Sequence, residues 1–308
     1  MNPIAISLNF DSLSEAYNFP KNFRDPSYFE GFDRLANLCD KHNIPLSIFV
    51  VGKDLKNPEN AAMVKKWSLQ GHEIGNHSFS HHFNLASLSD IKIRDEILYS
   101  HDLITKVTGF EPKGFISPAW STSTALISNL IELNYIYDTS LFPSIYLYPM
   151  IFRIALKHWR NPSKAIRMLQ RKDWFAHLTL PKDPFYIDKF SNIYKSKCED
   201  RLLILPLPTK NKLSLCIWHT IGFLMGWTNF KTNLKRLVRN KKGFYYVIHP
   251  ADFLGQDDLD KNYKMSLARM NYPLEDKIKI LDEIFYILKN SERKITTMKE
   301  LAQTIKTA

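Results

Sequence analysis

The sequence predicts an α/β fold in which the strands of a parallel sheet alternate with helices. Residues 4–11 form an apolar run that ends in a carboxylate, as a buried strand does. Residues 44–52 and 244–248 are further apolar runs, and His249 and a proline follow the second. Segments with apolar residues at helical spacing lie between such runs. Strands and helices in this order imply a parallel sheet with right-handed crossovers.

The expected elements follow one another with short connections. A helix is expected at 28–42, where Phe32, Leu35 and Leu38 lie on one face. Ser87 or Ser89 can cap a later helix that runs to about residue 108. The other expected helices are at 58–70, 125–133, 276–288 and 298–305, and the other expected strands are at 71–77, 114–117, 135–137, 202–207 and 294–296.

Residues 144–200 depart from this alternation. Basic residues are mixed with aromatic and aliphatic ones over 146–175, and 229–242 is basic again. This composition is typical of helices that lie on an anionic bilayer, and it also fits amphipathic helices that cover a barrel. We expect one domain over 1–308 with a basic, aromatic insertion at about 144–200, and an anionic membrane surface as a partner.

The net charge indicates which binding partners the protein can have, and the cysteines indicate the redox state of its compartment. The chain has 42 basic and 31 acidic residues, a net charge of +11, which fits an anionic partner or a lysine-rich surface from an AT-rich genome. No arginine- and glycine-rich tract or nucleic-acid module is present, so nucleic acid is not an expected partner. Cys39, Cys198 and Cys216 lack metal or redox spacing and are expected to be reduced packing residues.

The chain enters its first expected strand at once, without a signal-peptide pattern. No apolar run reaches the roughly 18 residues that indicate a membrane span. We therefore expect a cytoplasmic protein that can attach peripherally to the inner membrane.

Residues 71–82 contain two imidazoles four residues apart, His77 and His81. Their nitrogens can face one point if the chain between them makes a helical turn. Neutral imidazole is a preferred ligand of zinc and its neighbours, although the pattern alone also fits histidines that cap or pack. Because two histidines do not complete a site, a carboxylate must come from elsewhere. Asp11, at the end of a central strand, lies where α/β folds gather their chemistry.

Five segments resemble the NodB-type polysaccharide deacetylases (carbohydrate esterase family 4), which are metal-dependent amidases of N-acetylated sugars. The matching segments occur in the family's order and are 9–11, 71–81, 114–121, 137–143 and 247–250, whereas 144–200 matches little. The resemblance implies a distorted (β/α)7 barrel of the NodB homology type. It also supports Asp11, His77 and His81 as ligands of a divalent metal, for which zinc is the default.

The first motif departs from the family pattern, in which one acid is a general base and another is a metal ligand. If the motif is acid-x-acid, Asp11 is the ligand and Asn9 stands in place of the base. If the acids are adjacent, Asp11 is the base and Ser12 replaces the ligand. We prefer the first register, because residues 9 and 11 face the same side of a strand. Ile116 stands where the family has an arginine that pairs with the base, so both members of that pair are absent.

The resemblance also implies roles outside the metal site. His249 is the expected general acid for the amine nitrogen, with a pKa near neutrality. Ser117, Pro118 and Trp120 are expected to form one wall of the sugar pocket, where the indole would stack on a pyranose or simply pack in the core. Other polar residues near the motifs are expected outside the ligand set or at the surface: His72, His82 and Asp252.

The expected function is metal-dependent hydrolysis of the N-acetyl group of an amino sugar. The expected compartment and the basic stretches favour a sugar on a polyprenyl phosphate or a lipid A type carrier, as in surface-polysaccharide or lipopolysaccharide assembly. One alternative is a non-catalytic sugar- or lipid-binding pseudoenzyme, favoured by Asn9 and Ile116, since asparagine cannot accept the proton. Another is a deformylase of a lipid-linked sugar.

Overall fold

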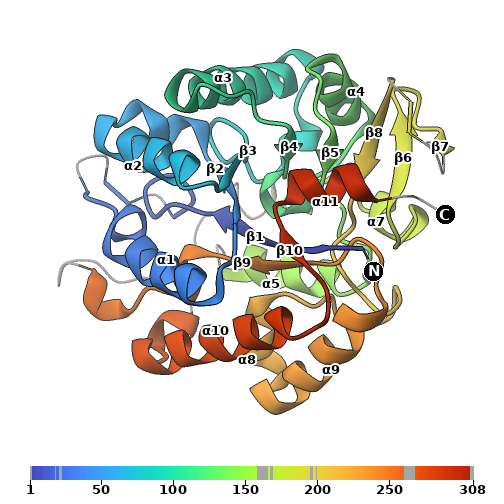
Figure 1. Ribbon diagram of the computed structural model, residues 1–308. Helices are drawn as coiled ribbons and strands as arrows, with labels where there is room; N and C mark the ends of the chain where they lie inside the picture. The colour runs from blue at the N-terminus through green and yellow to red at the C-terminus, as the bar shows by residue number, and fades with distance from the viewer. Residues whose placement is uncertain are drawn as a thin grey trace.

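The computed structural model describes residues 2–17, 19–20, 23–157, 166, 169–194, 197–198, 200–259 and 268–305. Parallel strands form the wall of a barrel, with helices packed around it (Figure 1). Seven strands follow one another in this wall: β9 (Tyr245–Ile248), β1 (Ile4–Phe10), β2 (Ser47–Val50), β3 (Glu73–Asn76), β4 (Gly114–Phe115), β5 (Tyr137–Asp138) and β8 (Arg201–Ile204). The α/β fold and the distorted barrel are therefore confirmed.

Strand β1 is the centre of the sheet. It pairs in parallel with β2 and with β9, and its first residues also pair with β10 (Ile295–Thr296). All seven of its residues are buried, which explains why the sequence shows a continuous apolar run rather than an alternating one.

The barrel wall is open on one side. Among the described residues, no strand pairing joins β8 to β9, and the hydroxyl of Tyr245 instead donates a hydrogen bond to the carbonyl oxygen of Leu205 at 3.1 Å. Two strands extend the sheet beyond β8 in antiparallel fashion, at the edge of the molecule in Figure 1: β6 (Phe185–Asp188) and β7 (Ile193–Tyr194). The sequence did not predict them.

The helices for which bounds were expected begin and end close to those positions. Asn57 and Ser123 accept hydrogen bonds from the first turns of the helices that follow them, and Thr297 forms a capping box with Glu300. The helices are α1 (Glu30–His42), α2 (Pro58–Leu69), α3 (Asp90–Thr108), α4 (Thr124–Glu132), α5 (Leu147–Lys157), α7 (Ala176–Thr179), α8 (His219–Met225), α9 (Trp227–Asn240), α10 (Leu274–Lys289) and α11 (Met298–Thr304). Of these, α5, α7, α8 and α9 had no expected bounds.

Helices α5 and α9, which belong to the basic segments, pack against the barrel. Helix α9 buries Phe230, Leu234 and Val238, as a covering amphipathic helix does. Helix α5 buries Leu147 and Ile151 but exposes apolar side chains as well: Phe152 is 54% exposed and Leu156 is 55% exposed. Several basic residues of the insertion lie outside the described residues: Arg160, Lys164 and Arg167. In the described part of the chain, no helix is both long and apolar enough to cross a membrane.

The cysteines are only partly packing residues. Cys39 and Cys216 are buried, as expected, whereas Cys198 is exposed, so the expectation was wrong there. Cys198 lies in the polar connection between β7 and β8.

Candidate metal centre

Parallel strands bring the two halves of the candidate centre together. Asp11 directly follows β1 and His77 directly follows β3, and both strands pair in parallel with β2 between them. The carboxyl ends of these strands therefore meet at one edge of the sheet, where α/β folds place their functional side chains.

Asp11, His77 and His81 converge on one point. The Oδ1 atom of Asp11 lies 3.1 Å from Nε2 of His77 and 3.2 Å from Nε2 of His81. The potential ligand atoms of the three residues all lie within 4.8 Å of one another. The side chain of His77 is 3% exposed, whereas those of His81 and Asp11 are 14% and 19% exposed, so the group opens to solvent on one side. Two imidazoles and one carboxylate suit a divalent transition metal, with coordination positions left for water and substrate.

The chain between the two histidines does not form the helical turn that the spacing predicts. Ser78 and His81 have left-handed backbones, with φ of 64° and 53°. A carboxylate on α3 holds this turn, because Glu96 accepts hydrogen bonds from the amides of Phe79 and Ser80 at 3.1 and 2.9 Å. Glu96 lies 15 residues beyond His81, and no local pattern marks it as a partner of this turn.

A main-chain oxygen orients His77. Its Nδ1 atom lies 2.7 Å from the carbonyl oxygen of Ile116. Because a carbonyl oxygen only accepts, Nδ1 carries the proton and the lone pair of Nε2 faces Asp11. Such an outer partner fixes the tautomer that a metal ligand needs. Ile116 thus supports the centre through its backbone, although its side chain cannot replace the arginine of the family pattern.

Asp11 is held in its charged form. Burial alone would raise the pKa of its carboxyl group, but the neighbouring imidazoles of His77 and His81 hold this pKa well below its usual value. Ser12, the alternative ligand, is buried outside the group, and its Oγ accepts a hydrogen bond from the amide of Glu15 at 3.2 Å. The geometry therefore favours the register in which Asp11 is the ligand and Asn9 stands in the base position.

Asn9 is buried in β1 and offers the centre no proton acceptor of useful basicity. Its Oδ1 atom accepts a hydrogen bond from Oγ of Ser7 at 3.1 Å, and the other end of the amide is an NH2 donor. Asn9 can therefore hold an oxygen atom by donating to it, but it cannot remove a proton from water.

His249 lies beside the group, after β9. Its Nε2 atom is 4.0 Å from Oδ2 of Asp11. Burial lowers the pKa of His249 to about 4. The expected pKa near neutrality was therefore wrong, and the imidazole is neutral at pH 7. Its role as general acid stays a prediction.

Asp252 is fully buried, so its expected surface position was wrong. Its Oδ2 atom accepts a hydrogen bond from the amide of His249 at 2.8 Å and lies 3.9 Å from Nδ1 of the same residue. Arg269, which follows an undescribed segment, lies 3.2 Å from Oδ1 of Asp252 and compensates its buried charge. The one-turn helix at Pro250–Asp252 turns the carboxylate inward, which the sequence did not reveal.

The predicted sugar wall follows β4 and is largely buried. Ser117 is 1% exposed and Trp120 is 6% exposed, as its core-packing alternative predicts. The Trp120 ring packs edge to face against Phe142 and Trp218, at centroid distances of 5.2 and 4.8 Å. Trp218, which the sequence did not single out, also contacts His249 at 5.3 Å. A stacking role for Trp120 stays a prediction.

Two histidines near the motif lie outside the ligand group, as expected. Nδ1 of His72 accepts a hydrogen bond from the amide of Leu46 at 3.1 Å. His82 is exposed, and its Nδ1 accepts from the amide of Asn84 at 3.3 Å.

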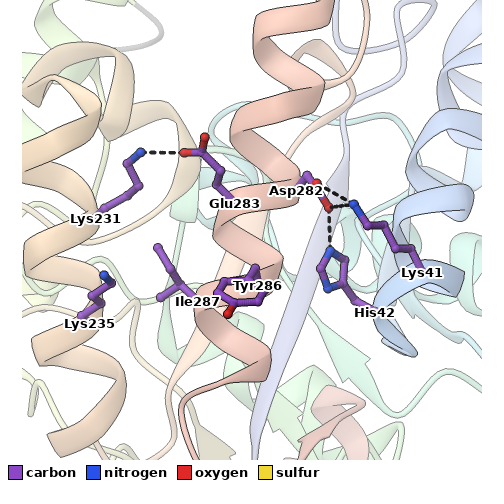
Figure 2. A pocket seen from close by; sticks show the side chains of 8 residues that line it. All are labelled: Lys41, His42, Lys231, Lys235, Asp282, Glu283, Tyr286 and Ile287. Carbon is purple, nitrogen blue, oxygen red and sulfur yellow. Dashed lines mark hydrogen bonds and ion pairs between the residues drawn. The ribbon is translucent and has the colours of Figure 1, made fainter.

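A separate hollow lies between α1, α9 and α10 (Figure 2). Asp282 of α10 pairs with Lys41 and with His42 of α1, and Glu283 pairs with Lys231 of α9. These ion pairs connect three covering helices, and none of the residues belongs to the ligand group.

We expect Zn²⁺ to bind one site per chain through this group. Replacing an outer partner of a metal ligand typically costs about 10–100-fold in affinity, so His77→Ala and Asp11→Ala should cost more than that. Titration calorimetry of the metal-free protein measures the loss. His82→Ala is the matched control and should bind as the native chain does. Equal losses in His82→Ala and His77→Ala would place the metal elsewhere.

A buried carboxyl group near the predicted wall should make stability depend on pH. Asp138 accepts a hydrogen bond from Oγ of Ser140 at 2.5 Å, and that oxygen accepts one from the amide of Ser117 at 2.8 Å. Burial raises the pKa of Asp138 from 3.8 to about 7. The folded state therefore binds this proton more tightly than the unfolded state, and its contribution to stability is lost as the pH rises from about 4 to 7.

We expect Asp138→Asn to remove this pH dependence. Relative to that of the native chain, the free energy of unfolding of the variant should increase from pH 5 to pH 8, as measured by urea unfolding at each pH. A difference between the two proteins that does not change with pH would contradict the burial of an ionisable Asp138.

Comparisons with known proteins find relatives among the sugar deacetylases. Residues 2–137 match the family model described as polysaccharide deacetylase. A peptidoglycan deacetylase of Helicobacter pylori is 28% identical over 193 residues, 62% of each chain. A peptidoglycan-N-acetylglucosamine deacetylase of Bacillus cereus is 30% identical over 98 residues, 32% of this chain and 34% of the relative. The chain thus spans less than two thirds of the length of these relatives.

The fold also agrees with a solved structure. A candidate polysaccharide deacetylase of Mycobacterium smegmatis superposes with a TM-score of 0.59 at 15% identity, covering 97% of this chain and 88% of that one. The family match includes Asp11, His77, His81 and the wall from Ser117, and His249 lies beyond it. Residues 2–137 therefore match the polysaccharide deacetylase family in sequence, and the whole chain has the fold of a solved candidate polysaccharide deacetylase.

Proposed function

We propose that the protein hydrolyses the N-acetyl group of an amino sugar in a glycan or a glycan precursor. The observation that carries the proposal is the convergence of Asp11, His77 and His81, with His249 4.0 Å from Asp11. The names of the relatives support an N-acetylated cell-wall sugar as the substrate class.

The ligand group fits Zn²⁺, because it offers two imidazole nitrogens, one of fixed tautomer, and an ionised carboxylate. Such an ion, when bound, polarises the amide carbonyl and makes its water a stronger acid. The residues of the chain must then move two protons: one away from the attacking water and one onto the leaving nitrogen.

We assign both proton transfers to His249. Asn9 cannot accept the first proton, and His249 is the imidazole outside the ligand group that faces Asp11. His249 takes a proton from water as the oxygen attacks the carbonyl carbon. It returns that proton to the amide nitrogen as the C–N bond breaks, which yields acetate and the free amine. Asn9 can donate a hydrogen bond to the oxygen of the attacking water or of the acetyl group.

The rival function is a pseudoenzyme that binds the sugar and the metal without turnover. Asn9 and the apolar Ile116 favour it, because general-base catalysis typically contributes about 10²–10⁴-fold. Hydrolysis of a formyl group is a further alternative, since the same ligands and proton transfers would serve it.

Acetate release from oligomeric N-acetylglucosamine by the zinc-loaded protein tests the proposal. The native chain should release acetate, and His249→Gln should reduce kcat by about 10²-fold or more because both proton transfers are lost. His82→Ala, outside the ligand group, is the control. Activity in Asn9→Asp alone would identify a pseudoenzyme, and formate release from an N-formyl analogue in place of acetate would identify a deformylase.

We further propose that the sugar is linked to a polyprenyl phosphate or a similar lipid, and that the protein works on the cytoplasmic face of the inner membrane. The net charge of +11 and the exposed Phe152 and Leu156 beside Arg153 on α5 support contact with an anionic lipid surface. The free thiols of the described cysteines fit a reducing compartment. A lipid-linked N-acetylhexosamine should therefore have a higher kcat/KM than the free sugar. Equal values would remove this part of the proposal.

A further inference from the structure

The insertion contributes a buried ion cluster that lies next to the predicted sugar wall. The guanidinium of Arg171 makes two hydrogen bonds with the carboxylate of Asp173, Nε to Oδ1 at 2.8 Å and Nη2 to Oδ2 at 2.6 Å. Nε2 of His177 lies 3.2 Å from the same Oδ2. The Arg171 and His177 side chains are 0% exposed and that of Asp173 is 2% exposed.

The remaining hydrogen-bonding groups of this cluster hold the main chain of the wall. Nη1 and Nη2 of Arg171 donate to the carbonyl oxygens of Ala119 and Trp120 at 2.8 and 2.9 Å. Oδ2 of Asp173 accepts from the amide of Thr122 at 2.9 Å. The cluster therefore fixes three positions of a single loop, from 119 to 122.

That loop needs such support, because its backbone is unusual. Ala119 and Trp120 both have left-handed conformations, with φ of 51° and 52°. Residues with a side chain rarely adopt this region, and two in succession persist only where the surroundings impose them. The carbonyl oxygens of these same two residues are the ones that Arg171 binds.

The cluster also fixes a neighbour of the wall. Nδ1 of His177 accepts a hydrogen bond from the amide of Phe142 at 3.2 Å, so Nε2 carries the proton that faces Asp173. Phe142 and Trp218 both pack against Trp120, and Trp218 packs against His249. A row of ring contacts thus leads from Phe142, whose amide the insertion binds, to the imidazole beside Asp11.

We propose that Arg171, Asp173 and His177 are positioning residues of the candidate active site. They hold Trp120 in its left-handed loop, and Trp120 and Trp218 hold the ring of His249. The insertion is then a part of the catalytic apparatus and not only a covering or lipid-facing segment. The contacts above support the positioning of the rings, whereas the effect of that positioning on kcat rests on the proposed function.

Arg171→Lys and Asp173→Asn test the proposal with little change in volume. Lysine keeps the charge but not the fork that reaches two carbonyl oxygens, and asparagine removes the charge of the acceptor. The perpendicular indoles of Trp120 and Trp218, 4.8 Å apart, should give an exciton signal in far-UV circular dichroism that Trp120→Phe abolishes.

Arg293→Lys is the matched control. Arg293 is also buried and donates to main-chain carbonyl oxygens, those of Asn2, Pro3, Val238 and Lys241, none of which belongs to the wall. This variant should lower the melting temperature and leave the exciton signal and kcat unchanged.

We expect the folded Arg171→Lys and Asp173→Asn proteins to lose most of the exciton signal and at least tenfold in kcat, with zinc affinity unchanged. Either variant with a native signal would overturn the proposal, and so would an equal loss in Arg293→Lys. If Arg171→Lys does not fold, Asp173→Asn decides. If the native chain releases no acetate, the proposed function fails, and the circular dichroism still decides whether the cluster positions the wall.

Discussion

The convergence of two imidazoles on the carboxylate of Asp11 is the interaction on which the site depends. It requires β1 and β3 to end at the same edge of the sheet, which their parallel pairing with β2 ensures. It also requires a fixed tautomer of His77, which the carbonyl oxygen of Ile116 provides. The fold therefore supplies the geometry through main-chain groups, and few side chains are needed to hold the ligands.

The two departures from the family pattern, Asn9 and Ile116, are consistent with each other. A carboxylate at position 9 would need a cation nearby, and an arginine at position 116 would need that carboxylate, since removing one partner of a buried pair is strongly destabilising. Asn9 and Ile116 remove both charges together. A partly exposed cation near the centre is Arg269, whose partner Asp252 accepts the main-chain hydrogen bond of His249. His249 is thus placed by charges from the C-terminal part of the chain.

The sequence was sufficient for the parts that depend on local pattern. Continuous apolar runs predicted β1, β2 and β9, and the spacing of His77 and His81 predicted that they lie together. The left-handed turn between those histidines was missed, because Glu96 stabilises it from another helix. Asp252, Arg269 and the cluster around Arg171 were missed for a similar reason. Their partners lie far along the chain or are main-chain atoms, and no periodicity marks such contacts.

We propose that Asp11, His77 and His81 together hold one metal ion. Anomalous diffraction at the zinc absorption edge, from crystals of the zinc-loaded protein, tests it most directly. We expect one strong peak bounded by Oδ1 of Asp11 and the Nε2 atoms of His77 and His81. A peak only at another imidazole and carboxylate pair, such as His42 and Asp282, or no peak at all, would contradict it.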